Sequence, residues 1–209
     1  MAISETTGHG PNEPRVVLVR HGETEWSRTG QHTGRTDIPL SQAGEYKAQL
    51  VGDALAGIPF GLVLSSPLGR ARETARLAGF SNAQPDPDLL EWDYGGYEGI
   101  TSAEIIERRG SPWTIWTDGV PPGETPGESA GDVSIRAQSI CDRIEPVLEA
   151  GGKVLLFSHG HFLRALAARW LGLEVKDGSL LALDTASISS LGFEHGRRVI
   201  TGWNRVPGR

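Results

Sequence analysis

The sequence predicts a single α/β domain in which a mainly parallel sheet lies between two layers of helices. Three short apolar runs indicate this fold class: residues 16–19 (VVLV), 62–64 (LVL) and 154–157 (VLLF). Runs of this kind are typical of strands that are buried on both faces of a parallel sheet. Segments with helical periodicity separate them, and this alternation predicts a three-layer α/β/α sandwich.

Length and composition narrow the class of protein. The 209 residues suit one domain, expected over 15–209, after a polar, flexible tail at 1–14. The net charge is -6, and no basic stripe indicates a nucleic-acid partner. Cys141 is the only cysteine, which excludes an intrachain disulfide and fits a reducing, cytoplasmic location. No secretory signal or membrane-spanning run is found, so no membrane partner is expected.

The first half of the chain alternates strands and helices in order. A strand over 15–19 leads into a long loop, and Ser41 is expected to cap a helix that reaches about Ala56. After the strand at 62–64, Ser66 and Pro67 have the residue types of a helix start. The helix that they predict carries Arg70, Arg72 and Thr74.

The second half continues the alternation and ends in a pair of strands. A short strand is expected at 88–90, and Thr101 with Glu104 forms a capping box for a helix to about Arg109. Residues 119–127 are rich in Gly and Pro and are expected to form a loop near the site. The other expected elements are a helix over 129–150, a strand over 153–157, a helix over 162–171, and strands over 186–193 and 197–203.

Two of the strands end in a histidine followed by glycine, as Arg20-His21-Gly22 and as His159-Gly160. In open α/β sheets, ligands bind in the crevice at the carboxyl ends of the strands, so the two histidines can converge on one site. Two imidazoles beside a guanidinium suit a phosphoryl group. Because the net charge is negative, the positive charge for an anion must be local. The candidates for it are Arg20, Arg35, Arg70 and Arg72.

Four motifs, in this order, resemble the histidine phosphatase superfamily, also called phosphoglycerate-mutase-like. They are RHGET at 20–24, SSPL at 65–68 followed by Arg70, LEWDYG at 90–95 and SHG at 158–160. The resemblance extends from residue 15 to about residue 193 and is strongest to short acid-phosphatase-like members, which are often labelled phosphoglycerate mutase. It implies that His21 is phosphorylated, that Arg20, Arg70 and His159 form the phosphate pocket, and that Glu91 is the acid/base.

The chemistry of these residue types agrees with the implied roles. A neutral imidazole attacks phosphorus when one ring nitrogen is bare and the other N–H is held, usually by a backbone carbonyl. The guanidinium groups of Arg20 and Arg70 match the equatorial phosphoryl oxygens, and a protonated His159 would supply another donor. A dianionic phosphate beside Glu91 favours the protonated carboxyl, which suits a general acid and predicts an acidic pH optimum.

No metal or cofactor is expected, because the arginines neutralise the phosphoryl charge. His159 and His161 have the spacing of a metal-binding pair, but no carboxylate or cysteine cluster accompanies them. His161 is instead expected to begin the following helix. Trp113 and Trp116 are expected in the core or in a pocket wall, and His32 is a candidate for the rim.

The loop after the first strand holds further candidates for phosphate binding. Thr33 and Gly34 match a Thr-Gly pair of the family, and Gly160 follows the second histidine. Ser27 stands where the family usually has asparagine, and its side chain is shorter. Gln31 stands where mutases often have arginine, which lowers the positive charge near the rim.

Trp92 favours a phosphatase over a mutase. Mutases that resemble this chain have arginine directly after the acid/base glutamate, and an aromatic residue removes that carboxylate partner and favours apolar or varied leaving groups. The expected activity is therefore hydrolysis of small-molecule phosphate esters. Three alternatives stay open: a 2,3-bisphosphoglycerate-dependent phosphoglycerate mutase, a phosphatase narrow for one metabolite, and a non-catalytic phosphate-binding module. A homodimer is the default expectation for assembly.

Overall fold

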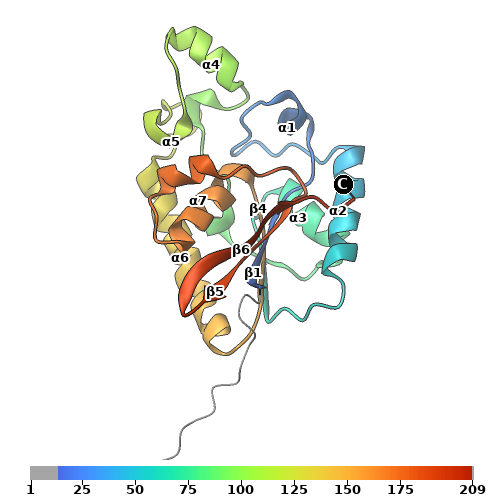
Figure 1. Cartoon of the computed structure of the whole chain (residues 1–209). Helices are drawn as coiled ribbons and strands as arrows, with labels where there is room; N and C mark the ends of the chain where they lie inside the picture. The colour runs from blue at the N-terminus through green and yellow to red at the C-terminus, as the bar shows by residue number, and fades with distance from the viewer. Residues whose placement is uncertain (1–13, 209) are drawn as a thin grey trace, which may run out of the picture.

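The described residues, 14–208 of a computed structural model, form a six-stranded sheet in the order β3-β2-β4-β1-β5-β6 (Figure 1). Neighbouring strands are parallel from β3 to β1, whereas β5 and β6 run antiparallel at the other edge. The mainly parallel sheet predicted from the sequence is therefore confirmed. The strands are β1 (Pro14–Arg20), β2 (Leu62–Ser65), β3 (Gln84–Pro85), β4 (Val154–Ser158), β5 (Ile188–Glu194) and β6 (Arg197–Arg205).

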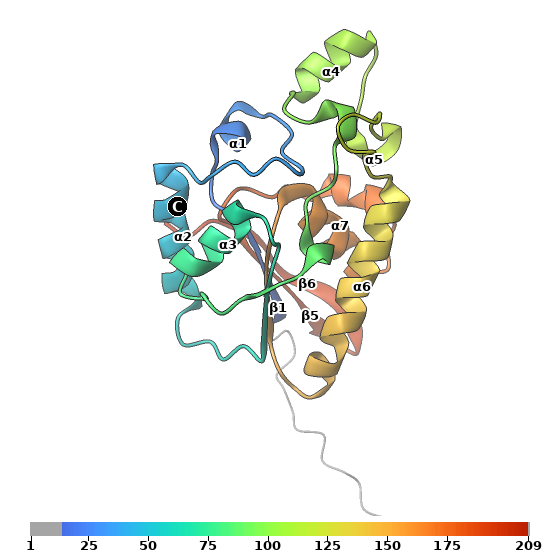
Figure 2. The ribbon, with the colours of Figure 1, turned by 180° about the vertical axis from the view of Figure 1, so that it is seen from behind.

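Helices cover both faces of the sheet, as the sequence predicts (Figure 2). Helices α2 (Gln42–Leu55) and α3 (Gly69–Leu77) lie on one face, and α6 (Ala130–Glu149) and α7 (Gly160–Trp170) lie on the other. Alternate side chains of each central strand enter the two hydrophobic clusters beneath these helices. In β1, Val17 and Val19 pack towards α2, whereas Val16 and Leu18 pack towards α6 and α7.

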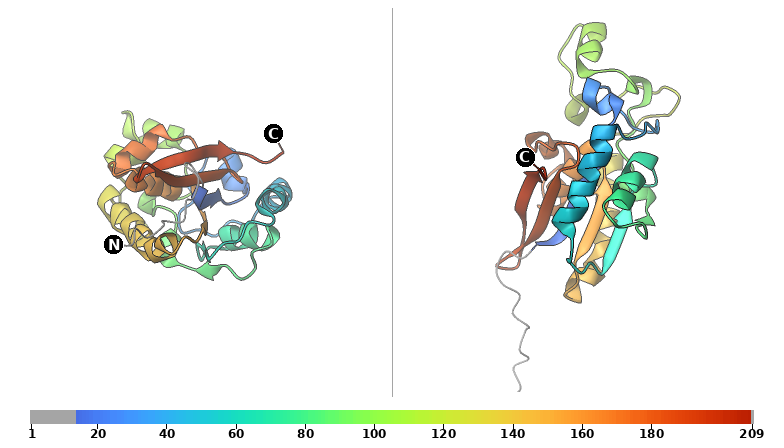
Figure 3. Two further views of the ribbon diagram at one scale, coloured as in Figure 1. Left: turned by 60° about the horizontal axis from the view of Figure 1, so that its bottom comes forward. Right: turned by 90° about the vertical axis from the view of Figure 1, so that its right-hand side faces the viewer.

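Short elements gather beyond the carboxyl ends of the parallel strands (Figure 1). They come from the loops after β1, β3 and α7, and the edge-on view of Figure 3 shows α4 standing farthest from the sheet. These elements are α1 (Glu25–Thr29), η2 (Gly95–Tyr97), α4 (Ser102–Arg109), α5 (Ile115–Asp118) and η3 (Val175–Leu180), with η1 (Pro87–Leu89) beside the sheet.

Side-chain caps begin three of the helices where the sequence predicts them. Ser41 Oγ accepts the amide N–H of Gly44 at the start of α2. Thr101 and Glu104 form the predicted capping box of α4. Ser129 caps α6, which ends at Glu149. Each cap binds backbone N–H groups that the first turn leaves without a helical partner.

Three expectations about local structure are wrong. The strand expected at 88–90 is the 3-10 turn η1, because Pro87 lacks an N–H and the Asp86 side chain accepts the amide of Asp88. Ser66 does not cap α3, whose N-cap is Leu68 without a side-chain hydrogen bond. Pro14 belongs to β1 instead of the tail. The rest of the expected tail, 1–13, lies outside the described residues.

The chain that leaves β1 crosses α2 at two glycines. A Cβ at Gly22 would lie 2.6 Å from the carbonyl oxygen of Gly44, and a Cβ at Gly44 would lie 2.2 Å from that of Glu23. Both clashes are with backbone, which has no rotamer to move away. This contact fixes the position of the turn at Gly22, directly after His21.

We expect Gly44→Ala to destabilise the protein by about 1–3 kcal/mol, because the added methyl group overpacks a backbone crossing. The effect opposes helix propensity, which favours Ala over Gly by about 1 kcal/mol. Urea unfolding measures the change, and Gln49→Ala, at an exposed position of α2, is the matched control. A Gly44→Ala protein as stable as the wild type would show that the crossing relaxes without cost.

Candidate active site

The pairing of β1 with β4 brings the two predicted histidines together. The parallel register aligns Arg20 with Ser158, and the amide of His21 donates to the carbonyl of Ser158 at 2.9 Å. His21 follows Arg20 and His159 follows Ser158, so this register places the two histidines side by side. Their ring centroids lie 5.1 Å apart. The convergence predicted from the sequence is present in the fold.

His21 has the geometry that a nucleophilic imidazole needs. Its Nδ1 lies 2.7 Å from the Gly22 carbonyl oxygen, which accepts the Nδ1–H. The amide of Gly22 donates to Thr74 Oγ1 at 2.9 Å and holds the turn. Nε2 is left without a hydrogen bond to the described residues. Burial and the charges of Arg70 and Arg20 hold the pKa of His21 well below 6.5, so the ring is neutral at pH 7.

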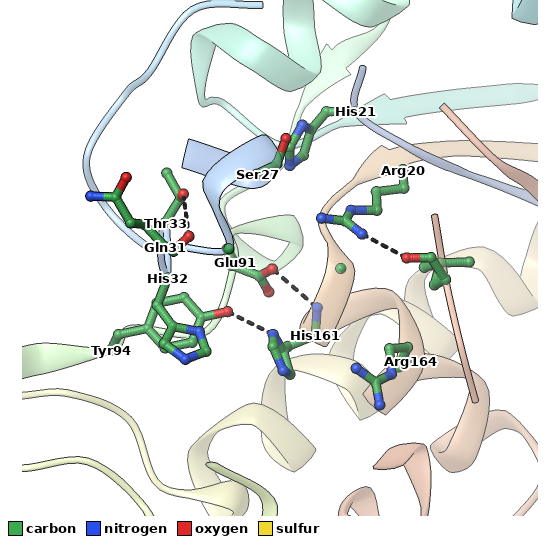
Figure 4. A pocket seen from close by; sticks show the side chains of 13 residues that line it. Arg20, His21, Ser27, Gln31, His32, Thr33, Glu91, Tyr94, His161 and Arg164 are labelled. Atoms are coloured by element: carbon green, nitrogen blue, oxygen red, sulfur yellow. Dashed lines mark hydrogen bonds between the residues drawn. The ribbon is translucent and has the colours of Figure 1, made fainter. Parts of the chain in front are cut away.

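Arg20 presents unused hydrogen-bonding capacity to the same cavity (Figure 4). Its Nη1 donates to the carbonyl oxygen of Leu183 at 2.6 Å. Its Nε is buried without a partner among the described residues, and buried donors in folded proteins are almost always paired. The guanidinium lies against Gly160, where a Cβ would approach Arg20 Cζ to 3.2 Å. The glycine leaves room for this arginine beside an incoming anion.

Arg70 and His159 lie behind the cavity and do not line it. Both are fully buried, and Arg70 Nε donates to His159 Nδ1 at 3.1 Å. Ser66 Oγ lies 2.7 Å from His159 Nε2, so both ring nitrogens are engaged. Because Nδ1 accepts a hydrogen bond, His159 is neutral; burial and the Arg70 charge hold its pKa well below 6.5. The additional donor that a protonated His159 would supply is therefore absent in this form of the site.

The other donors of Arg70 bind backbone carbonyls of the loop after α1. Nη1 donates to Thr36 O at 2.8 Å, and Nη2 donates to Gly34 O at 2.9 Å and to Thr33 O at 3.0 Å. The sequence predicted that this guanidinium faces phosphate. In the structure this guanidinium instead holds the loop at 33–36 through its backbone carbonyls, a contact called here the clasp.

Glu91 reaches the cavity at the N-terminus of α7 (Figure 4). One carboxylate oxygen accepts the amides of Trp92, at 2.9 Å, and Phe162, at 2.8 Å. The other accepts the amide of His161 at 3.0 Å. The helix start thus binds Glu91 through N–H groups that have no helical partner. This arrangement fixes the carboxylate on the wall of the cavity that Arg20 and His21 also line.

The remaining phosphate-binding candidates occupy different places. Ser27 and Thr33 line the cavity, but their hydroxyl groups donate to backbone carbonyls, of Thr24 and Gln31 respectively. Gly34 does not line it, and its amide donates to the carboxylate of Glu98. Gly160 lines the cavity beside Arg20. Of these four candidates, Gly34 alone lies away from the cavity wall.

Sequence reasoning missed part of the cavity wall. Tyr94 and His161 face the cavity, with the Tyr94 hydroxyl 2.7 Å from His161 Nδ1. The HxH spacing of His159 and His161 at a strand end indicated a metal pair or a helix start in the sequence, but not a place on the cavity wall. Trp113 meets His32 edge to face, with ring centroids 5.4 Å apart, and Trp116 packs at a tilt against His161, at 5.2 Å; both indoles belong to the core. Gly30, Arg164 and Leu183 are the other lining residues that the sequence analysis did not single out.

Four features that the sequence suggested near the site lie away from the cavity wall. Trp92 is fully buried and donates from Nε1 to the carbonyl of Glu128, so its side chain does not face the leaving group. Arg35 lies near the carboxylates of Asp93 and Glu128 instead of the cavity. Arg72 is exposed on α3. The loop at 119–127 packs against Gly95 and Gly96 and does not line the cavity either.

The cavity is small, with a volume of about 170 Å³. That is below the usual range of drug-sized pockets, about 300–1,000 Å³, and suits a phosphoryl group with a short leaving group. Among the described residues, no cluster of three or more His, Cys, Asp or Glu side chains could hold a metal ion. The lining residues are Arg20, His21, Ser27, Gly30, Gln31, His32, Thr33, Glu91, Tyr94, Gly160, His161, Arg164 and Leu183.

Comparison with known proteins gives the family. The profile of the histidine phosphatase superfamily (branch 1) matches residues 16–206. An acid phosphatase of Mycobacterium tuberculosis is 42% identical over 193 residues, which cover 90% of this chain and 91% of that protein. Sedoheptulose 1,7-bisphosphatase of Saccharomyces cerevisiae is 38% identical over 189 residues, 78% of this chain and 69% of that protein.

A solved structure has the same fold. The product of an open reading frame of Mycobacterium tuberculosis is 40% identical and aligns with a TM-score of 0.84 over 93% of this chain and 98% of that chain. The chain therefore belongs to the histidine phosphatase superfamily (branch 1). The resemblance predicted from the four motifs is confirmed, and the enzyme class is that of the phosphatases.

Buried neutral histidines make the stability of the protein depend on pH. Burial lowers the pKa of His32 to about 4, and His21, His159 and His161 have pKa values well below 6.5. Below pH 6.5 the unfolded chain binds protons that the folded chain does not. The contribution of these rings to the free energy of unfolding is therefore complete above pH 6.5, and it falls progressively as the pH drops towards 4.

We expect the urea midpoint to fall between pH 7 and pH 5, and His32→Gln to flatten that fall. His195→Gln, at an exposed position in the turn between β5 and β6, is the control and should keep the wild-type pH dependence. A midpoint of unfolding that does not change from pH 7 to pH 5 would contradict the neutral state of the buried rings.

Proposed function

We propose that this phosphatase hydrolyses small phosphate monoesters through a phosphohistidine on His21, without a metal or cofactor. The observation that carries the proposal is the state of His21. Its Nδ1–H is held by the Gly22 carbonyl, Nε2 is open, and the pKa is lowered, so the neutral ring can attack phosphorus. The unpartnered Nε of Arg20 supports an anion in the same cavity.

The proposed reaction has two displacements. In the first, His21 Nε2 bonds to phosphorus, the ester P–O bond breaks, and Glu91 gives a proton to the leaving oxygen. In the second, water bonds to phosphorus, the N–P bond breaks, and Glu91 takes a proton from the water. The position of Glu91 on the wall of the same cavity as His21 supports this role.

Arg20 is proposed as the direct phosphate ligand, together with the backbone beside Gly160. Arg70 and His159 join it when a phosphoryl group draws Arg70 away from the carbonyls of 33–36. An arriving anion also favours protonation of His159, which its present contacts oppose. Ser27, Thr33 and Gly34 stay proposed ligands whose polar groups must first exchange their backbone or carboxylate partners.

We also propose short phosphate esters as substrates, a cytoplasmic location and a homodimer. The small cavity supports short phosphate esters as substrates. No helix of the described residues is long and apolar enough to cross a membrane. Cys141 is buried, and burial raises the pKa of its thiol to about 11, which agrees with a packing role. A cytoplasmic location and a homodimer remain proposals from the sequence, and light scattering in solution tests the second.

We expect His21→Ala to lower p-nitrophenyl phosphate hydrolysis by about 10³-fold or more, because the covalent route is lost. The wild type should keep its activity in EDTA and form an acid-labile phosphohistidine after rapid quenching with labelled substrate. His195→Ala is the matched histidine control.

A coupled mutase assay with 3-phosphoglycerate and the bisphosphoglycerate primer tests the alternative. Mutase turnover far above hydrolysis would overturn the phosphatase proposal. Loss of hydrolysis in EDTA would overturn its metal independence.

The acid role of Glu91 predicts a dependence on the leaving group. For Glu91→Gln we expect about a 10²–10⁴-fold loss with glycerol 3-phosphate, whose alkoxide needs a proton. We expect a much smaller loss with p-nitrophenyl phosphate, because nitrophenolate leaves as a stable anion. Glu124→Gln, exposed in the loop at 119–127, is the control. Equal losses with the two substrates would mean that Glu91 only caps α7.

A further inference from the structure

Arg164 is a cation of the cavity that the proposed reaction does not use. It projects from α7, one helical turn after Gly160, and lines the same cavity as His21 and Arg20. Figure 4 shows it beyond His161, on the side of the cavity away from His21. A group that contacts His21 through its phosphorus would therefore direct its leaving alcohol towards Arg164.

The Arg164 guanidinium is fixed before any ligand arrives. Nε donates to the carbonyl of Gly178 at 3.0 Å, and Nη2 donates to that of Ser179 at 3.1 Å. Its Cζ lies 4.7 Å above the ring of Trp116. Two carbonyls and one aromatic face thus hold the side chain in one orientation, which lowers the entropy cost of binding a partner.

No carboxylate within the described part of the chain forms an ion pair with Arg164. Its Nη1 has no hydrogen-bond partner among those residues. The side chain is half-buried, and burial lowers its pKa. The carboxylate of Glu91, on the same cavity, is the main charge that attracts Arg164, but it forms no ion pair with it and its oxygens accept the three amides of Trp92, His161 and Phe162. A free guanidinium nitrogen in a partly desolvated wall favours an anionic partner.

We infer that Arg164 binds an anionic group, a carboxylate or a second phosphate, on the leaving alcohol of the substrate. The inference rests on the proposed phosphatase reaction and names the substrate class for that cavity. It replaces the expectation drawn from Trp92. The indole of Trp92, the residue after Glu91, lies in the core. The positive charge on the leaving-group side of the cavity is instead carried by Arg164 of α7.

The small volume limits the distance between the two anionic groups. A cavity of about 170 Å³ holds a short carbon chain between a phosphoryl group at His21 and an anion at Arg164. Three-carbon phosphates with a carboxylate fit this description, and bisphosphates of longer chains would require the rim to open. Substrates with a carboxylate and substrates with a second phosphate can therefore be distinguished by experiment.

Matched substrates test the inference. Glycerol 3-phosphate and 3-phosphoglycerate have the same three-carbon chain. The first has a neutral alcohol at the end where the second has a carboxylate. Fructose 6-phosphate and fructose 1,6-bisphosphate form the corresponding pair for a second phosphate. For Arg164→Gln we expect kcat/KM to fall by about 10–100-fold, mainly through KM, for the member of a pair that carries the anion. Activity on glycerol 3-phosphate and p-nitrophenyl phosphate should stay within about two-fold of the wild type.

Two further measurements separate substrate binding from a structural role. Arg169→Gln, on the same helix but bonded to Gln138 outside the cavity, should leave the wild-type ratios within each pair unchanged. In the wild type, the preference for the anionic member should weaken as ionic strength rises, because the scissile phosphate is common to the pair and only the second charge differs. This measurement needs no variant and stands even if Arg164→Gln unfolds.

Equal losses of Arg164→Gln on all substrates, or a preference that ionic strength does not change, would overturn the inference. A selective loss for 3-phosphoglycerate alone would assign a carboxylate, and one for fructose 1,6-bisphosphate alone would assign a second phosphate. None of these results affects the dependence of p-nitrophenyl phosphate hydrolysis on His21, so the inference and the proposed function can fail separately.

Discussion

The in-register pairing of β1 with β4 is the constraint on which the rest of the site depends. The hydrogen bond from the His21 amide to the Ser158 carbonyl extends the parallel ladder by one residue beyond β1. It places two histidines side by side where both strands stop. A shift of one residue would turn one of these side chains to the opposite face of the sheet. The two hydrophobic clusters prevent such a shift, because it would expose Val17 and Val19 or bury them on the wrong side.

Elements with regular patterns could be predicted from the sequence, and so could the residues at strand ends. The strands around His21 and His159 are apolar on both faces, and the caps at Ser41 and Thr101 use local chemistry that a sequence displays directly. The direction of a buried polar side chain could not be predicted in this way. Ser66 has the residue type of a helix cap, yet its hydroxyl contacts His159, ninety-three positions further along the chain. Only the packing of β2 beside β4 decides between the two partners.

The site shows the same limit on sequence reasoning. Motif positions gave His21, Arg20 and Glu91 as residues of one cavity, because each follows a strand or a short turn at the same edge of the sheet. The motif could not reveal that Arg70 faces backbone carbonyls or that Trp92 points into the core. These orientations depend on the loop at 33–36 and on Glu128, both distant in sequence. Arg164 was missed because a helix of mostly apolar residues gives no signal for one polar position on a cavity wall.

The clasp of Arg70 on the loop at 33–36 has a consequence for turnover. In the proposed reaction, each hydrogen bond that this arginine forms with an anion replaces one with a carbonyl, so the net gain in free energy is smaller than for a free guanidinium. The loss is the same for every anion, but a transition state with more charge on its equatorial oxygens recovers more of it than inorganic phosphate does. In the proposed reaction, product is therefore held less tightly than the reacting group. Release of phosphate would return the most buried cation of the site to the carbonyl partners that it has in the free enzyme.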